Sequence, residues 1–100
     1  MNTYVIRRKN AWQSTEDLEA AASRSAQIGN GEMRDKVRWI RSYVVQEENG
    51  TLGTVCIYQA VGPEAIKEHA SKVGMPADEI RRVARTVIVR EDPVEAGQAA

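Results

Sequence analysis

His69 is the side chain in this sequence best suited to proton transfer or metal binding, and it is the only histidine. Its imidazole titrates near neutral pH, where a general acid or base is useful. It follows Ile66 by three residues and precedes Val73 by four, on the apolar face of a predicted helix. One interpretation is a core-edge histidine that hydrogen-bonds a tyrosine or a backbone carbonyl. The other is a ligand or acid–base residue that faces a cleft between helices and sheet. Functional sites are few in any one protein, which favours the first interpretation, a structural histidine.

Three aromatic residues form a second group. Trp39 and Tyr43 are four residues apart in one predicted strand, and Tyr58 lies in the strand predicted to pair with it. Alternation places Trp39 and Tyr43 on the same face. Such residues usually anchor a core or an interface, which is the favoured interpretation, but they could also line a pocket for a small planar ligand. The candidate pocket residues are therefore Trp39, Arg41, Tyr43, Tyr58 and His69.

Standard catalytic and metal-binding motifs are absent from the sequence. It contains no CxxC, HExxH or GxSxG motif and no phosphate-binding glycine loop. One histidine and one cysteine nearly exclude a usual zinc site within a single chain. Cys56 lies mid-strand with no base placed beside it, so we expect it to be a small buried apolar residue. No catalytic residue can be named from the sequence.

Composition limits the classes of function. The 14 basic and 14 acidic residues leave a formal net charge of +0, so the basic footprint of a nucleic-acid-binding protein is missing. The local basic runs at 7–9 and 81–85 are expected to be solvated faces. The sequence has no apolar run of membrane-spanning length and no signal-peptide pattern near its start. A lone cysteine fits a reducing compartment, and we expect a cytoplasmic protein with no nucleic-acid or membrane partner.

Apolar periodicity and capping residues predict six elements. Strands are expected over 3–8, 37–45, 52–60 and 80–89. A first helix is expected to begin at Ser14 or Thr15 and to end at Gly29 to Gly31, and a second to begin at Gly62-Pro63 and end at Gly74. Asn49-Gly50 predicts a hairpin between the middle strands. Residues 1–90 would form one domain and 91–100 a flexible tail.

This β-α-β-β-α-β order predicts an α+β, ferredoxin-like fold. Right-handed crossovers place both helices on one face of a four-stranded antiparallel sheet. The strand 37–45 is apolar on both sides, with Val37, Trp39, Tyr43 and Val45 on one face and Ile40 and Val44 on the other. A contiguous apolar sheet face favours a two-fold homodimer through that face, giving an assembly like a dimeric α+β barrel, over a monomer with scattered exposed apolar residues.

Three segments, VRWIRSYV, TVCIYQA and GPEAIKEHASKVGMPADEIRRV, resemble the small actinobacterial nickel-binding (nickel-responsive) ferredoxin-like proteins, a family long described as a domain of unknown function. The resemblance spans roughly residues 3 to 89. It implies a ferredoxin-like dimer and, in at least some members, bound nickel. Among the matched positions, His69 is the residue that remains a good metal ligand.

Two positions depart from the family pattern. Arg7 stands where the first strand commonly carries glutamate, and Arg41 where the second often carries histidine. A guanidinium cannot bind a metal, and its charge repels the cation. The two arginines could instead prepare a site for an anion such as a carboxylate or phosphate.

The leading hypothesis is a small non-enzymatic binding protein of the nickel-responsive type, with weakened or altered metal affinity. The alternative is a small dimeric ferredoxin-like enzyme of the cofactor-free monooxygenase or cyclase type. Its organic substrate would lie between helices and sheet, against His69, Tyr58, Trp39 and Arg41. A third possibility is an interaction module that acts through the dimer face itself.

Overall fold

The computed structural model describes residues 1–93 and has the predicted order of elements. Four strands and two helices follow one another as β1 (Asn2–Trp12), α1 (Thr15–Asn30), β2 (Val37–Gln46), β3 (Leu52–Ala60), α2 (Pro63–Val73) and β4 (Glu79–Arg82). Among these residues, no helix is both long enough and apolar enough to cross a membrane.

Local sequence signals account for the ends of both helices. Ser14 caps α1, because its side chain accepts a hydrogen bond from the Asp17 amide at 3.2 Å. Pro63 opens α2 at a position where its missing N–H costs nothing. Gly74 closes α2 in the left-handed region, with φ of 86°, and its amide donates to the Ala70 carbonyl. The hairpin predicted at Asn49-Gly50 also forms, joining β2 to β3.

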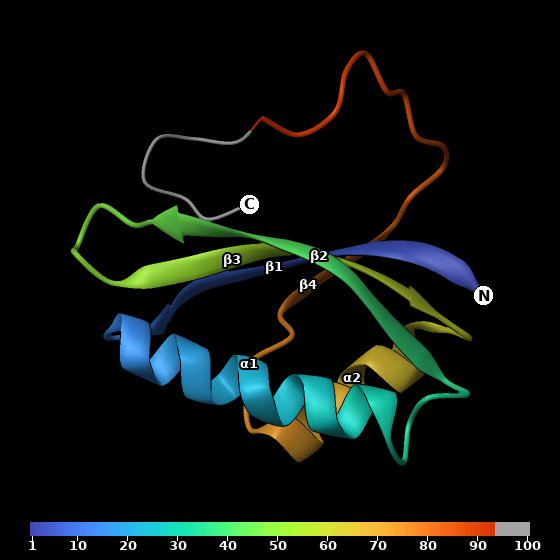
Figure 1. Cartoon of the computed structure of the whole chain (residues 1–100), viewed down its shortest axis with the longest axis horizontal. Helices are drawn as coiled ribbons and strands as arrows, with labels where there is room; N and C mark the ends of the chain where they lie inside the picture. Colours follow the sequence, from blue (N-terminus) through green and yellow to red (C-terminus); the bar gives the residue numbers. More distant parts are fainter. Residues whose placement is uncertain (94–100) are drawn as a thin grey trace.

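The strands form one antiparallel sheet in the order β2-β3-β1-β4. Both helices cover the same face of this sheet, and the chain after β4 passes to the opposite side (Figure 1). We call these the helix face and the outer face. This is the predicted ferredoxin-like arrangement, and the fold class is confirmed.

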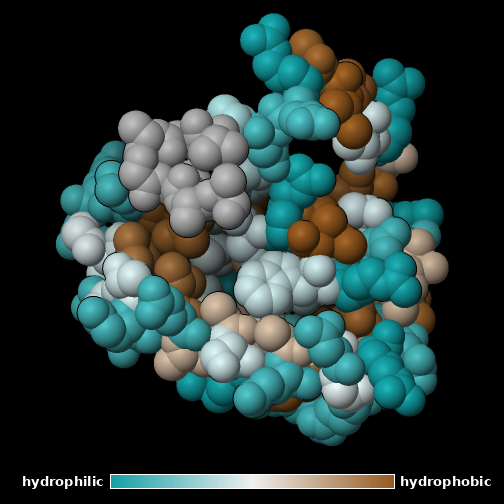
Figure 2. Space-filling model, viewed as in Figure 1, coloured by the Kyte–Doolittle hydropathy of each residue, from teal (hydrophilic) through white to brown (hydrophobic). Residues whose placement is uncertain are grey.

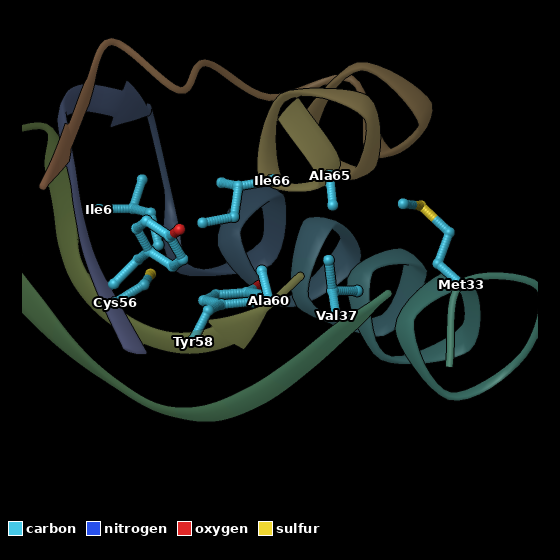
Figure 3. Packing of buried hydrophobic residues seen from close by; sticks show 9 residues of the cluster. Ile6, Met33, Val37, Cys56, Tyr58, Ala60, Ala65 and Ile66 are labelled. Carbon is cyan, nitrogen blue, oxygen red and sulfur yellow. The ribbon is translucent and has the colours of Figure 1, made fainter. Parts of the chain in front are cut away.

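The main core lies between the helix face and the two helices. Figure 3 shows Ile6, Cys56 and Tyr58 of the sheet directed toward Ile66 of α2. The face predicted for α2 is the buried one, since Ile66, His69, Ala70 and Val73 are all buried. Burial of these side chains fixes α2 against the sheet.

One prediction about β2 is wrong, because the strand contains a β-bulge. The pairing register with β3 shifts between Trp39 and Arg41, so Ile40 is inserted without a partner. Trp39 pairs with Tyr58 on the helix face, whereas Tyr43 pairs with Val55 on the outer face. The extra residue reverses the alternation, so Trp39 and Tyr43 do not share a face.

The last strand is shorter than predicted. β4 ends at Arg82, and within residues 1–93 one further backbone hydrogen bond follows it, from the Val83 amide to the Thr3 carbonyl at 2.8 Å. β4 runs antiparallel to β1, and Arg82 pairs with Tyr4, close to the start of β1 at Asn2. Residues beyond 83 therefore have almost no part of β1 left to pair with. The apolar residues 87–89 therefore lie outside the sheet and are exposed. Of the tail predicted at 91–100, residues 94–100 lie outside the described part.

Candidate ligand pocket

A pocket of about 270 Å³ lies between α1 and the helix face of the sheet. Residues of β1, α1, β2, β3 and the connection after α2 all contribute to its wall. The lining residues are Arg8, Trp12, Leu18, Glu19, Ala21, Ala22, Ser25, Trp39, Ser42, Val44, Thr54, Cys56, Tyr58 and Met75. This volume is near the lower end for small-molecule sites, so the ligand would be small.

The pocket exists because α1 turns small side chains toward the sheet. Ala21, Ala22 and Ser25 line it from the helix, together with Leu18. Side chains of this size cannot fill the space above a pleated sheet, whereas the bulkier face of α2 does fill it. The narrow apolar stripe of α1 thus produces a hollow on its own side of the molecule.

Aromatic side chains form one wall. Trp39 stacks on Tyr58 with ring centroids 6.2 Å apart and an interplanar angle of 9°. The Tyr58 hydroxyl lies 3.1 Å from Ser25 Oγ of α1, which fixes the ring. Desolvation raises the pKa of Tyr58, so its phenol is neutral at ordinary pH. Trp39 is 36 % exposed and lies where solvent can reach the stack.

The opposite end of the pocket is polar and buried. Arg8 is 1 % exposed; its Nε donates to the Pro76 carbonyl at 2.6 Å and its Nη1 to Cys56 Sγ at 3.2 Å. Its Nη2 has no partner among the described residues, and neither does Thr54 Oγ1. Arg8 and Thr54 are directly paired across β1 and β3, so the two free groups belong to neighbouring residues.

Arg8 corrects an expectation from the sequence, which placed the basic run 7–9 on a solvated face. It is among the largest fully buried side chains, beside Ile6 on the helix face. The alternation of Tyr4, Ile6 and Arg8 carried the signal for this placement. The clustering of three basic residues concealed it.

His69 lies in the core and does not line this pocket. Its ring packs against Tyr58 at 5.6 Å between centroids, and its Nε2 donates to the Ser25 carbonyl at 3.1 Å. Burial lowers its pKa, with the Arg8 charge acting in the same direction. The neutral ring therefore keeps a bare lone pair on Nδ1, which has no partner among residues 1–93.

Arg41 and Tyr43 lie on the outer face, away from the pocket. Both contact Asp92: Arg41 Nη1 donates to it at 2.8 Å, and the Tyr43 hydroxyl donates at 2.8 Å. The Tyr43 hydrogen bond, followed by Arg41, lowers the pKa of Asp92. Of the five candidate pocket residues, the structure thus brings together Trp39 and Tyr58, with His69 behind them.

Arg7 is likewise satisfied within the chain. Its Nη2 pairs with Glu47 at 3.0 Å, and Glu47 also accepts from the Asn10 amide at 2.8 Å. That amide first, and Arg7 second, lowers the pKa of Glu47. Because Arg7 and Arg41 are each ion-paired with a carboxylate of this chain, the anion site expected from them does not form.

The donor set does not fit a nickel ion within a single chain. In residues 1–93 no three His, Cys, Asp or Glu side chains come close enough to hold a metal. His69 offers one buried nitrogen, and the buried Cys56 sulfur accepts hydrogen bonds from Arg8 and from Ser42. Nickel requires several nitrogen or oxygen donors around one point.

Comparison with known proteins gives the family. The family model described as "Nickel responsive protein SCO4226-like" matches residues 4–83. The chain belongs to this family. The crystal structure of SCO4226 from Streptomyces coelicolor A3(2) is similar in fold, with a TM-score of 0.65. That similarity covers 85% of this chain and 99% of SCO4226, at 16% sequence identity. No curated protein matches the chain.

Several pocket residues were missed at the level of sequence. Trp12 escaped because β1 continues four residues beyond its predicted end, past a register shift at Asn10, whose φ is 52°. Thr54 has no distinguishing pattern, since one threonine in a strand resembles any other. Met75 lies in the connector after α2, where periodicity gives no information.

Proposed function

We propose that this member of the family is a non-catalytic binding protein whose ligand is a small organic molecule held between α1 and the sheet. The observation that carries the proposal is the pocket itself, with the Trp39–Tyr58 stack on one wall and unsatisfied polar groups at its buried end. An apolar pocket with a few convergent polar groups is the usual form of a small-molecule site.

Binding is favoured over turnover because, among the described residues, the lining holds no buried general base, and its carboxylate, Glu19, is exposed on α1. His69 was the candidate for that role, but it lies behind two lining residues, Tyr58 and Ser25, and does not line the pocket itself. The buried neutral phenol of Tyr58 is a poor base at ordinary pH. The monooxygenase or cyclase alternative therefore lacks the residue on which it depended.

The family's name makes nickel the first ligand to consider for this chain. The residues do not support a complete site in one chain, because Arg7 and Arg41 occupy the positions that could supply further donors. We therefore propose that the ligand of this chain is organic.

Filling the pocket tests the proposed function. Ala22 lines the pocket, so Ala22→Trp places an indole in the ligand's space, whereas Ala20→Trp adds the same group at an exposed position of α1. We expect 2-naphthamide, a neutral aromatic probe, to bind the wild-type chain and Ala20→Trp in calorimetric titrations. Ala22→Trp should weaken binding at least about tenfold, since steric exclusion removes the burial of the ring. Equal binding to all three proteins would refute the proposal.

Nickel binding is tested separately by titration with NiCl₂. We expect no stoichiometric site that depends on His69, because its only free nitrogen is buried and isolated. Wild-type protein and His69→Ala should give the same heats. Uptake of about one nickel per chain that disappears in His69→Ala would contradict this prediction and restore the metal as the ligand.

A further inference from the structure

The buried end of the pocket contains an uncompensated positive charge. Arg8 forms no ion pair among residues 1–93, and its neighbours there are a carbonyl, a thiol and a hydroxyl. A buried guanidinium without a counter-charge is costly, and buried charges in proteins are normally paired. The described part of the chain leaves this one unpaired beside an open pocket.

Two donors remain free at that place. Arg8 Nη2 has no hydrogen-bond partner among the described residues, and Thr54 Oγ1 on the paired residue can donate its proton. Resting on the proposed function, we infer that the ligand is a small aromatic or aliphatic carboxylate, with its anionic group on Arg8 and Thr54. Its apolar body would lie against the Trp39–Tyr58 stack and beneath Leu18 and Ala22.

The pocket suits one negative charge better than several. Apart from Glu19, the remaining polar groups of the lining include hydroxyls that are already hydrogen-bonded, such as those of Ser25 and Tyr58. Glu19 lies in the lining from α1, is exposed, and would repel a multiply charged ligand such as a phosphate monoester. A carboxylate matches both the number of free donors and the net charge.

Entry of the ligand requires a small rearrangement. Nη2 of Arg8 and Oγ1 of Thr54 each expose less than 1 Å², so the carboxylate reaches them by parting the side chains around them. Trp39 and Met75 are only partly buried members of the lining and can move at low cost. Formation of the ion pair offsets this rearrangement because the buried charge of Arg8 gains a counter-charge and the free donors gain hydrogen bonds.

A matched pair of probes tests the inference. 2-Naphthoate and 2-naphthamide have nearly the same shape and differ in charge, so their ratio of dissociation constants isolates the anionic group. For the wild-type chain we expect the carboxylate to bind roughly ten- to a hundredfold more tightly than the amide, as for a hydrogen bond to a charged group. Arg8→Met should bring the two constants together, and Arg24→Met, which removes an exposed arginine of α1 that does not line the pocket, should not.

Two further variants keep the test decisive if Arg8→Met does not fold. Thr54→Val is nearly isosteric and should reduce the carboxylate preference several-fold. Glu19→Gln should tighten 2-naphthoate about two- to threefold and leave 2-naphthamide unchanged, because it removes a screened surface charge. If these residues had only a structural role, each substitution would change the dissociation constants of both probes by the same factor.

The possible failures are distinguishable. If 2-naphthamide binds the wild-type chain but not Ala22→Trp, and 2-naphthoate has no advantage, the pocket is a site but the carboxylate inference is wrong. If neither probe binds, the proposed function is wrong.

Discussion

Ser25 connects two aromatic side chains on the buried side of α1. Its Oγ lies 3.1 Å from the Tyr58 hydroxyl, and its carbonyl accepts from His69 Nε2 at 3.1 Å. The second bond requires the proton to be on Nε2, since a carbonyl only accepts. A second proton on Nδ1 would place a charge in the core beside the positive Arg8. His69 is therefore a structural residue that functions in its neutral form.

This arrangement predicts a pH-dependent loss of stability. Burial lowers the folded-state pKa of His69 below its ordinary value of 6.5. The unfolded chain then takes up a proton more readily than the folded chain, so the free energy of unfolding falls as pH falls from 6.5 through the folded-state pKa. Urea unfolding of wild type at pH 7.5 and 5.0 should show this loss. His69→Gln retains a donor for Ser25 without the titration and should show a smaller one. The same pH dependence in both proteins would contradict the prediction.

At the scale of elements, two register shifts determine what reaches the pocket. The shift in β2 turns Trp39 and Val44 to the helix face, and the shift in β1 returns Trp12 to the same pocket. The β1 shift is held by the Arg7–Glu47 ion pair and by the Asn10 amide, which also binds Glu47. β3 passes closely under this contact at Gly53.

Gly53→Ala tests how tightly the strands pack there. A Cβ at this position would lie 2.5 Å from the Arg8 backbone oxygen and 2.7 Å from Arg7 Nη1, and the backbone oxygen cannot swing away. We expect a loss of about 1–3 kcal/mol in the free energy of unfolding, the usual cost of overpacking. Gly62→Ala meets no atom within 4 Å and is the control. Urea denaturation of both variants checks the prediction, and equal effects would contradict it.

The register shifts in β1 and β2 are also features that could not be predicted from the sequence. Capping by Ser14 and the face of α2 follow from local rules and were predicted correctly. The bulge at Ile40 adds one residue without any compositional signal, so the periodicity of β2 assigned Tyr43 to the wrong face. The pocket could not be predicted from the sequence either. It forms because the small side chains of α1 leave space above the sheet, and this depends on how α1 packs in three dimensions.

At the scale of the molecule, the outer face of the sheet is the part where apolar side chains are least covered. The segment after β4 stands away from the sheet (Figure 1) and leaves an open hollow of about 740 Å³, lined by Val5, Tyr43, Ile57 and residues of 83–92. Figure 2 shows apolar side chains on this raised segment, where Val87, Ile88 and Val89 are 71 %, 76 % and 82 % exposed. Exposed apolar surface of this kind marks interfaces, and we propose that a second copy covers it in a two-fold dimer.

The dimer is tested by light scattering after size-exclusion chromatography. Wild-type protein should have about the mass of two chains, and the double variant Val87→Lys/Val89→Lys should have the mass of one, because buried lysines would oppose association. Val61→Lys changes an equally apolar residue, 58 % exposed, in the turn between β3 and α2, and should remain dimeric. A wild-type protein that is monomeric at every concentration would exclude this interface.

The hydrogen bonds at the buried end of the pocket have an optical consequence. Trp39 Nε1 donates to Ser42 Oγ at 2.8 Å, Ser42 donates to Cys56 Sγ at 3.0 Å, and Arg8 donates to the same sulfur at 3.2 Å. An indole at the solvent boundary is thus connected through a hydroxyl and a thiol to the buried cation. Neutralising that cation should repolarise the whole series. The wavelength of Trp39 fluorescence emission would then shift when the pocket is occupied, so binding could be followed without an added label.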